Sequence, residues 1–302
     1  MSVDADYLVD RRRLKRRLLF WRIAAVVAVL VAVVAAVGRF HDSAVGGHVA
    51  RLTVDGVIVE DPDRLKALSE IAADDSVKAL IVRIDSPGGT VVGGESLYHY
   101  LRRVGESKPV VTVFGGMGTS AAYMAALGTD HIVARDGTIT GSIGVILQTT
   151  NLTGLLDKLG VEPIAVKSTP LKAQPNPLEP FSPAAREAIQ GVISELYSMF
   201  VALVEERRDL TPDQLARATD GRVFSGRQAL DNGLVDAIGG EPEARRWLEE
   251  KHAIDADVPV EDIEFEDPEE LVRKLLGESV GKVLFSERLR LDGLVSLWHP
   301  DL

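Results

Sequence analysis

The sequence predicts an α/β fold, with strands and helices that alternate along the chain and strands that pair largely in parallel. Short β-branched runs recur between residues 49 and 166, and amphipathic helical patterns separate most of them. Apolar residues make up 46% of the 302-residue chain, more than a disordered protein contains. Strands that alternate with helices imply crossover connections, which favour parallel pairing.

The expected strands span residues 49–54, 79–84, 110–114, 131–134, 143–146 and 163–166, and helices are expected between them at 62–73, 93–104, 120–128 and 152–159. Ser182 and Pro183 then begin a long helix, because Ser is a favoured N-cap and Pro is favoured at the first helical position. Apolar residues at helical spacing predict its buried face, formed by Ile189, Val192, Ile193, Leu196, Phe200, Leu203 and Val204.

Later elements are less regular. Thr211 and Pro212 begin another helix, and 229–240 has the pattern of a helix followed by a glycine turn. Residues 255–267 are strongly acidic, and 269–276 are predicted to form a short helix.

The first forty residues differ in character from this body. Six basic residues lie between Arg11 and Arg17, and an apolar run from Leu18 to Gly38 follows, interrupted only by Arg22. Its 21 residues reach the ~20 that cross a bilayer, and Trp21 suits the membrane interface. Because basic segments stay in the cytoplasm, we predict a cytoplasmic segment (1–17), a transmembrane anchor (18–38) and a linker (39–48). The body then lies on the periplasmic or extracytoplasmic side of the inner membrane.

Two alternatives to the anchor were weighed. A cleaved signal peptide would use Ala36, Val37 and Gly38 as its cleavage site, but the apolar run is long for a signal sequence. A buried core helix is disfavoured by the basic cluster that precedes it.

Composition and charge exclude several classes of function. The chain has no cysteine, which rules out disulfides, iron–sulfur ligation and a thiol nucleophile. The net charge is −11 although residues 1–40 carry +5, so the body is acidic and a poor match for nucleic acid. No residues have metal-ligand spacing. We expect no cofactor, metal or nucleic-acid partner.

Two glycine-rich turns follow predicted strands. In the first, Asp85 precedes Ser86, Pro87, Gly88 and Gly89, a sequence that turns sharply and can present backbone N–H groups to an anion. Taken alone, it is equally a tight turn, and it lacks the Walker A ending of a phosphate loop.

In the second turn, Ser120 stands at the start of a helix rich in small residues. Helix N-termini stabilise developing negative charge, although an ordinary N-cap serine fits the same pattern.

A lysine and the histidines complete the candidates. Lys172 lies in a Pro-rich segment in which Lys167 is the only other charged residue between 166 and 178. A lysine base must be neutral near pH 7, against a free pKa of ~10.4, and apolar burial can achieve this. An ordinary surface lysine is the alternative. Of the six histidines, only His99 and His131 are placed to complete a triad, and neither lies in a triad-like pattern.

Five stretches in order resemble the signal peptide peptidase A family of membrane-anchored Ser/Lys proteases, in its short form. They are 85–90, 119–123, 140–145, the Lys172 region and 221–236. The resemblance covers about residues 49–240 and implies the Clp-protease/crotonase fold of stacked β-β-α units. We therefore expect a peptidase domain at 49–251 and a C-terminal acidic extension at 252–302 of unknown role.

The resemblance also implies the site residues. Ser120 matches the nucleophile, Lys172 the general base, and the N–H groups of Gly89 and Ala121 the oxyanion hole, supported by the turn at Ser86, Pro87 and Gly88. The family often has two glycines after the serine, whereas this chain has Ala121 and Ala122, which are also small.

The resulting prediction is a serine endopeptidase that cleaves signal peptide remnants and similar apolar peptides at the bilayer. Two alternatives are a crotonase-type acyl-CoA enzyme and a non-catalytic membrane scaffold on the same fold; peptidases of other membrane proteins and phage-type maturation proteases are variants within the class. In the long form of the family, Ser and Lys come from different halves of the chain. We therefore expect a cyclic homo-oligomer with an interior chamber, in which copies complete one another's sites.

Overall fold

The computed structural model describes residues 21–22, 25–29, 47–263 and 295–297. It divides into two compact units, Met1–Gly47 and His48–Leu302. In the first unit, residues 21–22 and 25–29 are helical. The rest of the predicted transmembrane segment, the possible cleavage site at 36–38 and the predicted helix at 269–276 lie outside the described residues.

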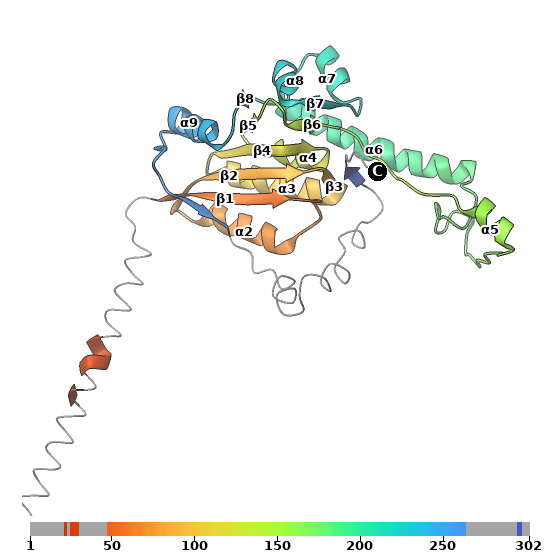
Figure 1. Cartoon of the computed structure of the whole chain (residues 1–302), viewed down its shortest axis with the longest axis horizontal. Helices are drawn as coiled ribbons and strands as arrows, with labels where there is room; N and C mark the ends of the chain where they lie inside the picture. The colour runs from red at the N-terminus through yellow and green to blue at the C-terminus, as the bar shows by residue number, and fades with distance from the viewer. Residues whose placement is uncertain (1–20, 23–24, 30–46, 264–294, 298–302) are drawn as a thin grey trace, which may run out of the picture. The chain divides into compact units, whose positions relative to one another are not determined.

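The second unit is built on an eight-stranded, mostly parallel sheet (Figure 1), which confirms the α/β prediction. Its strands in spatial order are β7, β6, β4, β2, β1 and β9, with β5 pairing to β4 and β8 to β5. Only β6 and β7 pair antiparallel within this sheet. The strands are β1 (His48–Asp55), β2 (Val77–Ser86), β4 (Val110–Thr119), β5 (His131–Ala134), β6 (Ile139–Gly141), β7 (Val223–Ser225), β8 (Ala237–Ile238) and β9 (Val260–Asp262).

Helices cover both faces of the sheet because successive strand residues point to opposite sides. Leu80 and Val82 of β2 belong to one core cluster, whereas Ala79 and Ile81 belong to the other. The first cluster receives α2 (Pro62–Ala73), α3 (Val91–Gly105), α4 (Ala121–Ala126) and the C-terminal end of α6 (Pro183–Arg207). The second receives α9 (Glu241–His252), which the sequence analysis did not predict.

Local capping explains why the predicted helices begin where they do. Asp61 accepts hydrogen bonds from the N–H groups at the start of α2, Thr90 caps α3, and Ser182 caps α6. The helix predicted after Thr211 is α7 (Pro212–Ala218), whose N-terminus has a capping box. α8 (Gly226–Asp231) begins a few residues before its predicted position.

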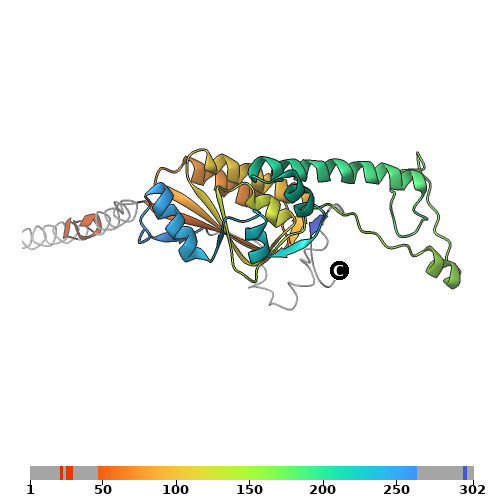
Figure 2. The ribbon, with the colours of Figure 1, turned by 90° about the horizontal axis from the view of Figure 1, so that it is seen from above.

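An arm formed by residues 147–182 and the N-terminal half of α6 extends away from the sheet (Figures 1 and 2). It contains α5 (Thr153–Leu159), but the strand predicted at 163–166 is absent from it, and the one predicted at 143–146 is replaced by a loop. Ile164 is 85% exposed and Val166 fully exposed. The apolar pattern there therefore does not mark a strand buried within this chain.

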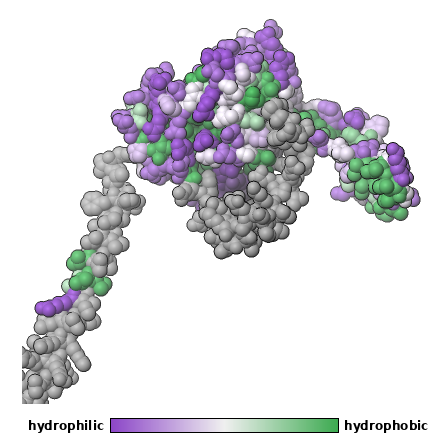
Figure 3. Space-filling model, in the orientation of Figure 1, coloured by the Kyte–Doolittle hydropathy of each residue, from purple (hydrophilic) through white to green (hydrophobic). Residues whose placement is uncertain are grey.

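The predicted buried face of α6 is also only partly correct. Phe200 and Val204 are buried, whereas Val192 is 42% exposed. Within the described part of the chain, α6 is the one helix long and apolar enough to cross a membrane. Most side chains of its N-terminal half are exposed or half-buried, and Figure 3 shows apolar surface at the far end of the arm.

A separate two-stranded ladder completes the fold. β3 (Gly88–Thr90) follows β2 directly, and β10 (Val295–Leu297) pairs with it in antiparallel orientation. Neither strand was predicted from the sequence.

Candidate active site

Ser120 stands where β4 ends and α4 begins, in a backbone conformation that is rare for a residue with a side chain. Its φ and ψ angles are 59° and −120°. Its N–H donates to the carbonyl of Gly141 at 2.8 Å, and its own carbonyl accepts from Met124 N at 2.9 Å. The Ser120 side chain makes no capping hydrogen bond to α4. The ordinary N-cap interpretation therefore does not account for this serine, and such strain is typical of functional sites.

Small residues hold α4 close to its neighbours. A Cβ on Gly94 of α3 would lie 3.0 Å from the Cβ of Ala121, so α3 and the first turn of α4 are in close contact. At the next turn, Tyr123 is fully buried and its hydroxyl donates to the carbonyl of Leu234 at 2.8 Å. Burial raises the pKa of Tyr123, which keeps the hydroxyl protonated as a donor.

The glycine turn directs the N–H group of Gly89 toward the edge of β3 that pairs with β10. The Ser86 hydroxyl accepts from Gly88 N at 3.1 Å, and Gly88 has a φ of 105°. The carbonyl of Gly88 and the N–H of Thr90 both bond to the backbone of Ile58, each at 2.8 Å. Because peptide groups alternate in direction along a strand, the N–H and carbonyl of Gly89 point to the opposite edge of β3.

Gly89 has no room for a side chain. A Cβ there would lie 1.8 Å from the carbonyl oxygen of Ile58. The close backbone approach that orients β3 therefore requires glycine at this position.

The two turns are adjacent because of an excursion in β4. β2 pairs Ile84 with Phe114 and Ser86 with Gly118, so three residues of β4 face Asp85 alone. The Asp85 carboxylate accepts from Met117 N at 2.9 Å. On the other side of the excursion, the Thr138 hydroxyl donates to the Gly115 carbonyl at 2.7 Å. These side chains fix the end of β4, which leads into Ser120, beside the turn that contains Gly89.

Lys172 is placed differently from Ser120. Ser120 is 1% exposed in the body, whereas Lys172 is exposed on the arm, between α5 and α6. The apolar burial expected for Lys172 is therefore not found among the residues that the structure describes. Lys167 forms a hydrogen-bonded ion pair with Glu179. This hydrogen bond is the main reason that the pKa of the Glu179 carboxyl is lowered.

The two candidate histidines, His99 and His131, lie away from Ser120. His131 is at the start of β5, opposite Val111 in register, whereas Ser120 follows the far end of β4. Val111 and Ser120 are nine positions apart, and the excursion at 115–117 shortens the path along the strand by about two of them, so the separation is on the order of 20 Å. His131 stacks on Trp247 with centroids 4.8 Å apart, and burial lowers its pKa. His99 is exposed on α3. Neither His99 nor His131 is therefore placed to complete a triad with Ser120.

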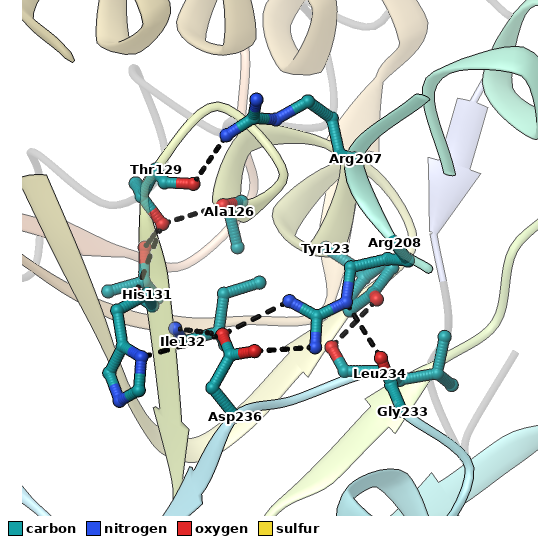
Figure 4. A network of polar contacts seen from close by, with 11 residues as sticks. Tyr123, Ala126, Thr129, His131, Ile132, Arg207, Arg208, Gly233, Leu234 and Asp236 are labelled. Atoms are coloured by element: carbon teal, nitrogen blue, oxygen red, sulfur yellow. Dashed lines mark hydrogen bonds and ion pairs between the residues drawn. The ribbon is translucent and has the colours of Figure 1, made fainter. Parts of the chain in front are cut away.

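A polar network connects the end of α6 to the helix that follows Ser120 (Figure 4). Arg208 donates to both carboxylate oxygens of Asp236, at 2.8 and 3.0 Å, and to the carbonyl of Gly233 at 2.7 Å. Asp236 also accepts from Ile132 N at 2.8 Å. Arg207 donates to the carbonyl of Leu127, just beyond α4, at 3.0 Å. The base of the arm is thereby fixed to the element that positions Ser120.

The sequence analysis assigned no role to Asp85 or Thr138, whose side chains fix the end of β4, or to Ser142, which lies beside the residue that bonds to Ser120. Ser142 follows Gly141, the acceptor of the Ser120 N–H bond, and has a positive φ of 52°. Its position within the stretch 140–145 was the available signal. Within the described residues, no group of three or more His, Asp or Glu side chains is arranged to bind a metal.

Comparison with known proteins places the site in context. Residues 102–255 match peptidase family S49. The putative protease slr0021 of Synechocystis is 41% identical, over 76% of this chain and 83% of its own length. A putative signal peptide peptidase SppA of Enterococcus faecium is 32% identical, over 72% of this chain and 68% of its own. A solved membrane-bound stomatin-specific protease aligns with a TM-score of 0.48 at 17% identity, over 73% of this chain and 99% of its own.

Proposed function

Because the chain belongs to peptidase family S49, we propose that it is a membrane-anchored serine endopeptidase with Ser120 as nucleophile and Lys172 as general base. The observation that carries this proposal is the strained turn at Ser120, which lies next to the turn whose Gly89 N–H points away from Ile58 to the opposite edge of β3. A nucleophile beside preorganised N–H donors is the arrangement that acyl transfer requires.

In the proposed reaction, neutral Lys172 accepts the proton of Ser120 as Oγ bonds to the peptide carbonyl carbon. The carbonyl oxygen takes the negative charge, which the N–H groups of Gly89 and Ala121 stabilise. Protonated Lys172 then donates its proton to the amine as the C–N bond breaks. A water molecule, deprotonated by neutral Lys172, attacks the acyl carbon; as the bond from that carbon to Oγ breaks, protonated Lys172 returns the proton to Oγ, which releases the acid and regenerates Ser120.

We propose that Lys172 comes from a neighbouring copy in a cyclic homo-oligomer. Lys172 is exposed on the arm while Ser120 is buried in the body, so the dyad forms only if an arm reaches another body. Burial against that body would also provide the apolar surroundings that favour a neutral lysine. The arm has apolar side chains available for such contacts, among them Leu155, Leu159, Val161, Ile164, Val166 and Val192.

The proposed substrates are signal peptide remnants and similar apolar peptides left in the bilayer. An anchor at residues 18–38 would hold the catalytic body at the extracytoplasmic surface of the inner membrane, where such remnants remain. A relative named as a putative signal peptide peptidase supports this substrate class.

We also infer that the fold is of the Clp-protease/crotonase type. β2, β3 and α3 follow one another as a β-β-α unit, and so do β5, β6 and α5. In the first of these units, β3 and its Gly89 lie directly before α3.

A serine-reactive fluorophosphonate probe tests the proposal directly. Mass spectrometry of the labelled full-length protein should place the adduct on Ser120, and Ser120→Ala should abolish both labelling and peptide cleavage. Lys172→Ala should abolish cleavage, whereas Lys167→Ala, a matched lysine on the same arm, should retain it. Because the base must lose a proton, activity should rise with pH from neutral to alkaline values. An adduct elsewhere, or a fully active Lys172→Ala protein, would contradict the assignment.

A further inference from the structure

Lys172 lies in a segment that is shaped by its own hydrogen bonds. Its N–H donates to the carbonyl of Thr169 at 3.1 Å, and the N–H of Gln174 donates to the carbonyl of Leu171 at 3.2 Å. Lys172 and its immediate neighbours in the sequence are exposed. The backbone around Lys172 is therefore held by hydrogen bonds within residues 167–179, which we call the lysine loop.

The backbone turns sharply immediately after Lys172. Ala173 has a φ of 59°, a conformation that residues with a side chain rarely adopt. Its carbonyl accepts from the Asn176 side-chain amide at 2.8 Å, and the Asn176 amide oxygen accepts from the N–H of Leu178 at 3.0 Å. Such a conformation persists only where the surrounding contacts hold it. The contacts of the residues that follow Lys172 therefore determine the path of its backbone.

Glu179 connects the two sides of the lysine loop. One oxygen of its carboxylate, Oε2, accepts from the Gln174 side-chain amide at 2.7 Å and also from the Lys167 ammonium group. Lys167 precedes Lys172 in the sequence and Gln174 follows it. These contacts are partly buried, and hydrogen bonds to an ionised group are stronger than those between neutral groups. A single carboxylate therefore holds the loop on both sides of the proposed base.

We propose that Glu179 is a positioning residue for Lys172, because its carboxylate fixes the lysine loop in the shape that presents the Lys172 amine to a Ser120 hydroxyl. This inference rests on the proposed function, in which Lys172 is the general base. Glu179 itself touches no reacting atom and acts through the loop. A misplacement of about 1 Å in a catalytic group costs about 100-fold, so a small change in the loop has a large effect on the rate.

The two donors to Glu179 do not contribute equally. The bond from Gln174 closes the turn directly after Lys172, and it remains in place when Lys167 is replaced. Replacement of Glu179 removes both bonds, so its effect on activity should be the larger one. The pKa of Glu179 is lowered, chiefly by the hydrogen bond from Lys167, so the carboxylate stays ionised at neutral and alkaline pH. The expected rise of activity with pH therefore does not come from Glu179.

Steady-state cleavage of a fluorogenic peptide by the full-length protein tests this inference. Glu179→Ala should lower kcat about tenfold or more while KM stays within about twofold, because the base is displaced and the peptide-binding strand is not. Glu179→Gln keeps an oxygen that accepts from Gln174 and should retain most of the activity. Glu162→Ala, which removes an exposed carboxylate from the same arm, is the matched control and should cleave like the wild type. Equal losses in Glu179→Ala and Glu179→Gln would overturn the inference.

The rate at which a fluorophosphonate probe labels Ser120 separates positioning from a general effect on the fold. Glu179→Ala should slow labelling about tenfold in the wild-type background. It should leave the slow residual labelling of Lys172→Ala unchanged, because no base remains to be positioned. A further loss of rate in the double variant would show that Glu179 acts by another route, and would overturn the inference.

Hydrogen–deuterium exchange of the lysine loop, followed by mass spectrometry, measures the loop without any catalysis. In full-length Ser120→Ala protein, the amides of Lys172 and Gln174 should exchange about tenfold faster when Glu179→Ala is added, and Glu162→Ala should leave them unchanged. Unchanged exchange, or a wild-type kcat in Glu179→Ala, would overturn the inference and leave the proposed function standing. If the wild-type protein cleaves no peptide and its Ser120 is not labelled, the proposed function fails, and the exchange rates alone decide whether Glu179 holds the loop.

Discussion

Gly89→Ala is expected to abolish most of the peptidase activity for a reason that can be worked from the structure. The added Cβ would lie 1.8 Å from the carbonyl oxygen of Ile58, 2.5 Å from its carbon and 2.6 Å from its nitrogen. Real Cβ atoms are essentially never closer than 3.0 Å to such atoms, so β3 and the Ile58 backbone must separate by at least 1.2 Å. The atoms that the Cβ would meet are all backbone atoms of Ile58, so the clash cannot be relieved by a side chain changing its rotamer.

That displacement moves the proposed oxyanion donor away from its target. A misplacement of about 1 Å in a catalytic group costs ~100-fold, and the loss of one oxyanion donor costs about 100- to 1000-fold in kcat. We therefore expect kcat to fall by about two to three orders of magnitude, or about 3–4 kcal/mol of transition-state stabilisation. Ser120 itself is untouched, so the probe should still label the variant, at a lower rate.

The assay is steady-state cleavage of a fluorogenic peptide, with thermal unfolding of the same samples to show that the variant is folded. Gly137→Ala is the matched control, since Gly137 is exposed and a Cβ there has no atom within 4 Å. A folded Gly89→Ala protein with kcat within about threefold of wild type would refute Gly89 as an oxyanion donor.

Three further predictions concern the supporting structure. Asp85→Ala removes the acceptor of the Met117 N–H and should lower kcat about tenfold or more, with little change in KM. Asp85→Asn keeps an acceptor oxygen and should retain most of the activity. Equal losses of activity in the two variants would show that this hydrogen bond is not the reason for the loss. Tyr123→Phe leaves the buried Leu234 carbonyl without its donor and should lower the free energy of unfolding by about 1–3 kcal/mol in urea denaturation, and an unchanged midpoint would contradict this. Burial lowers the pKa of His131, so the folded state resists its protonation and stability should fall as the pH drops below about 6.5. The loss of Tm between pH 7.5 and 5.5 should be smaller in His131→Phe, which keeps an aromatic ring on Trp247, and a loss of the same size would exclude His131 as its source.

Elements specified by local signals were predictable from the sequence. The bounds of α2 match the predicted 62–73, and the cap at Ser182 begins α6 as expected. β1, β2 and β5 occupy their predicted positions to within about two residues, because buried parallel strands have a continuous apolar pattern.

Elements specified by distant partners were not predictable. β3 consists of two glycines and a threonine, a composition with little strand propensity, and it is ordered by the backbone of Ile58. β10 depends on a partner about two hundred residues away. Conversely, apolar residues at 163–166 and along α6 are exposed although their pattern predicts burial, because a pattern of apolar residues does not state which surface, if any, covers them.

The candidate site shows the same division. The turns containing Gly89 and Ser120 were identifiable as glycine-rich and small-residue sequences after strands, and the structure places them side by side. The sequence left two possibilities for Lys172, apolar burial and an ordinary surface position, because a Pro-rich apolar segment has the same composition in both cases, and the structure shows it exposed.

The most direct test of the shared site is complementation between two inactive proteins. Ser120→Ala and Lys172→Ala chains, each full length and with its own affinity tag, are co-expressed, and the complexes that carry both tags are isolated. In a cyclic arrangement, each site takes Ser120 from one copy and Lys172 from its neighbour, so random mixing leaves about one quarter of the sites intact. We predict that the mixed complexes recover up to about a quarter of the wild-type activity, whereas each variant alone has none. Mixed complexes without recovered activity, or a wild-type protein that is fully active as a monomer in sedimentation, would contradict the account.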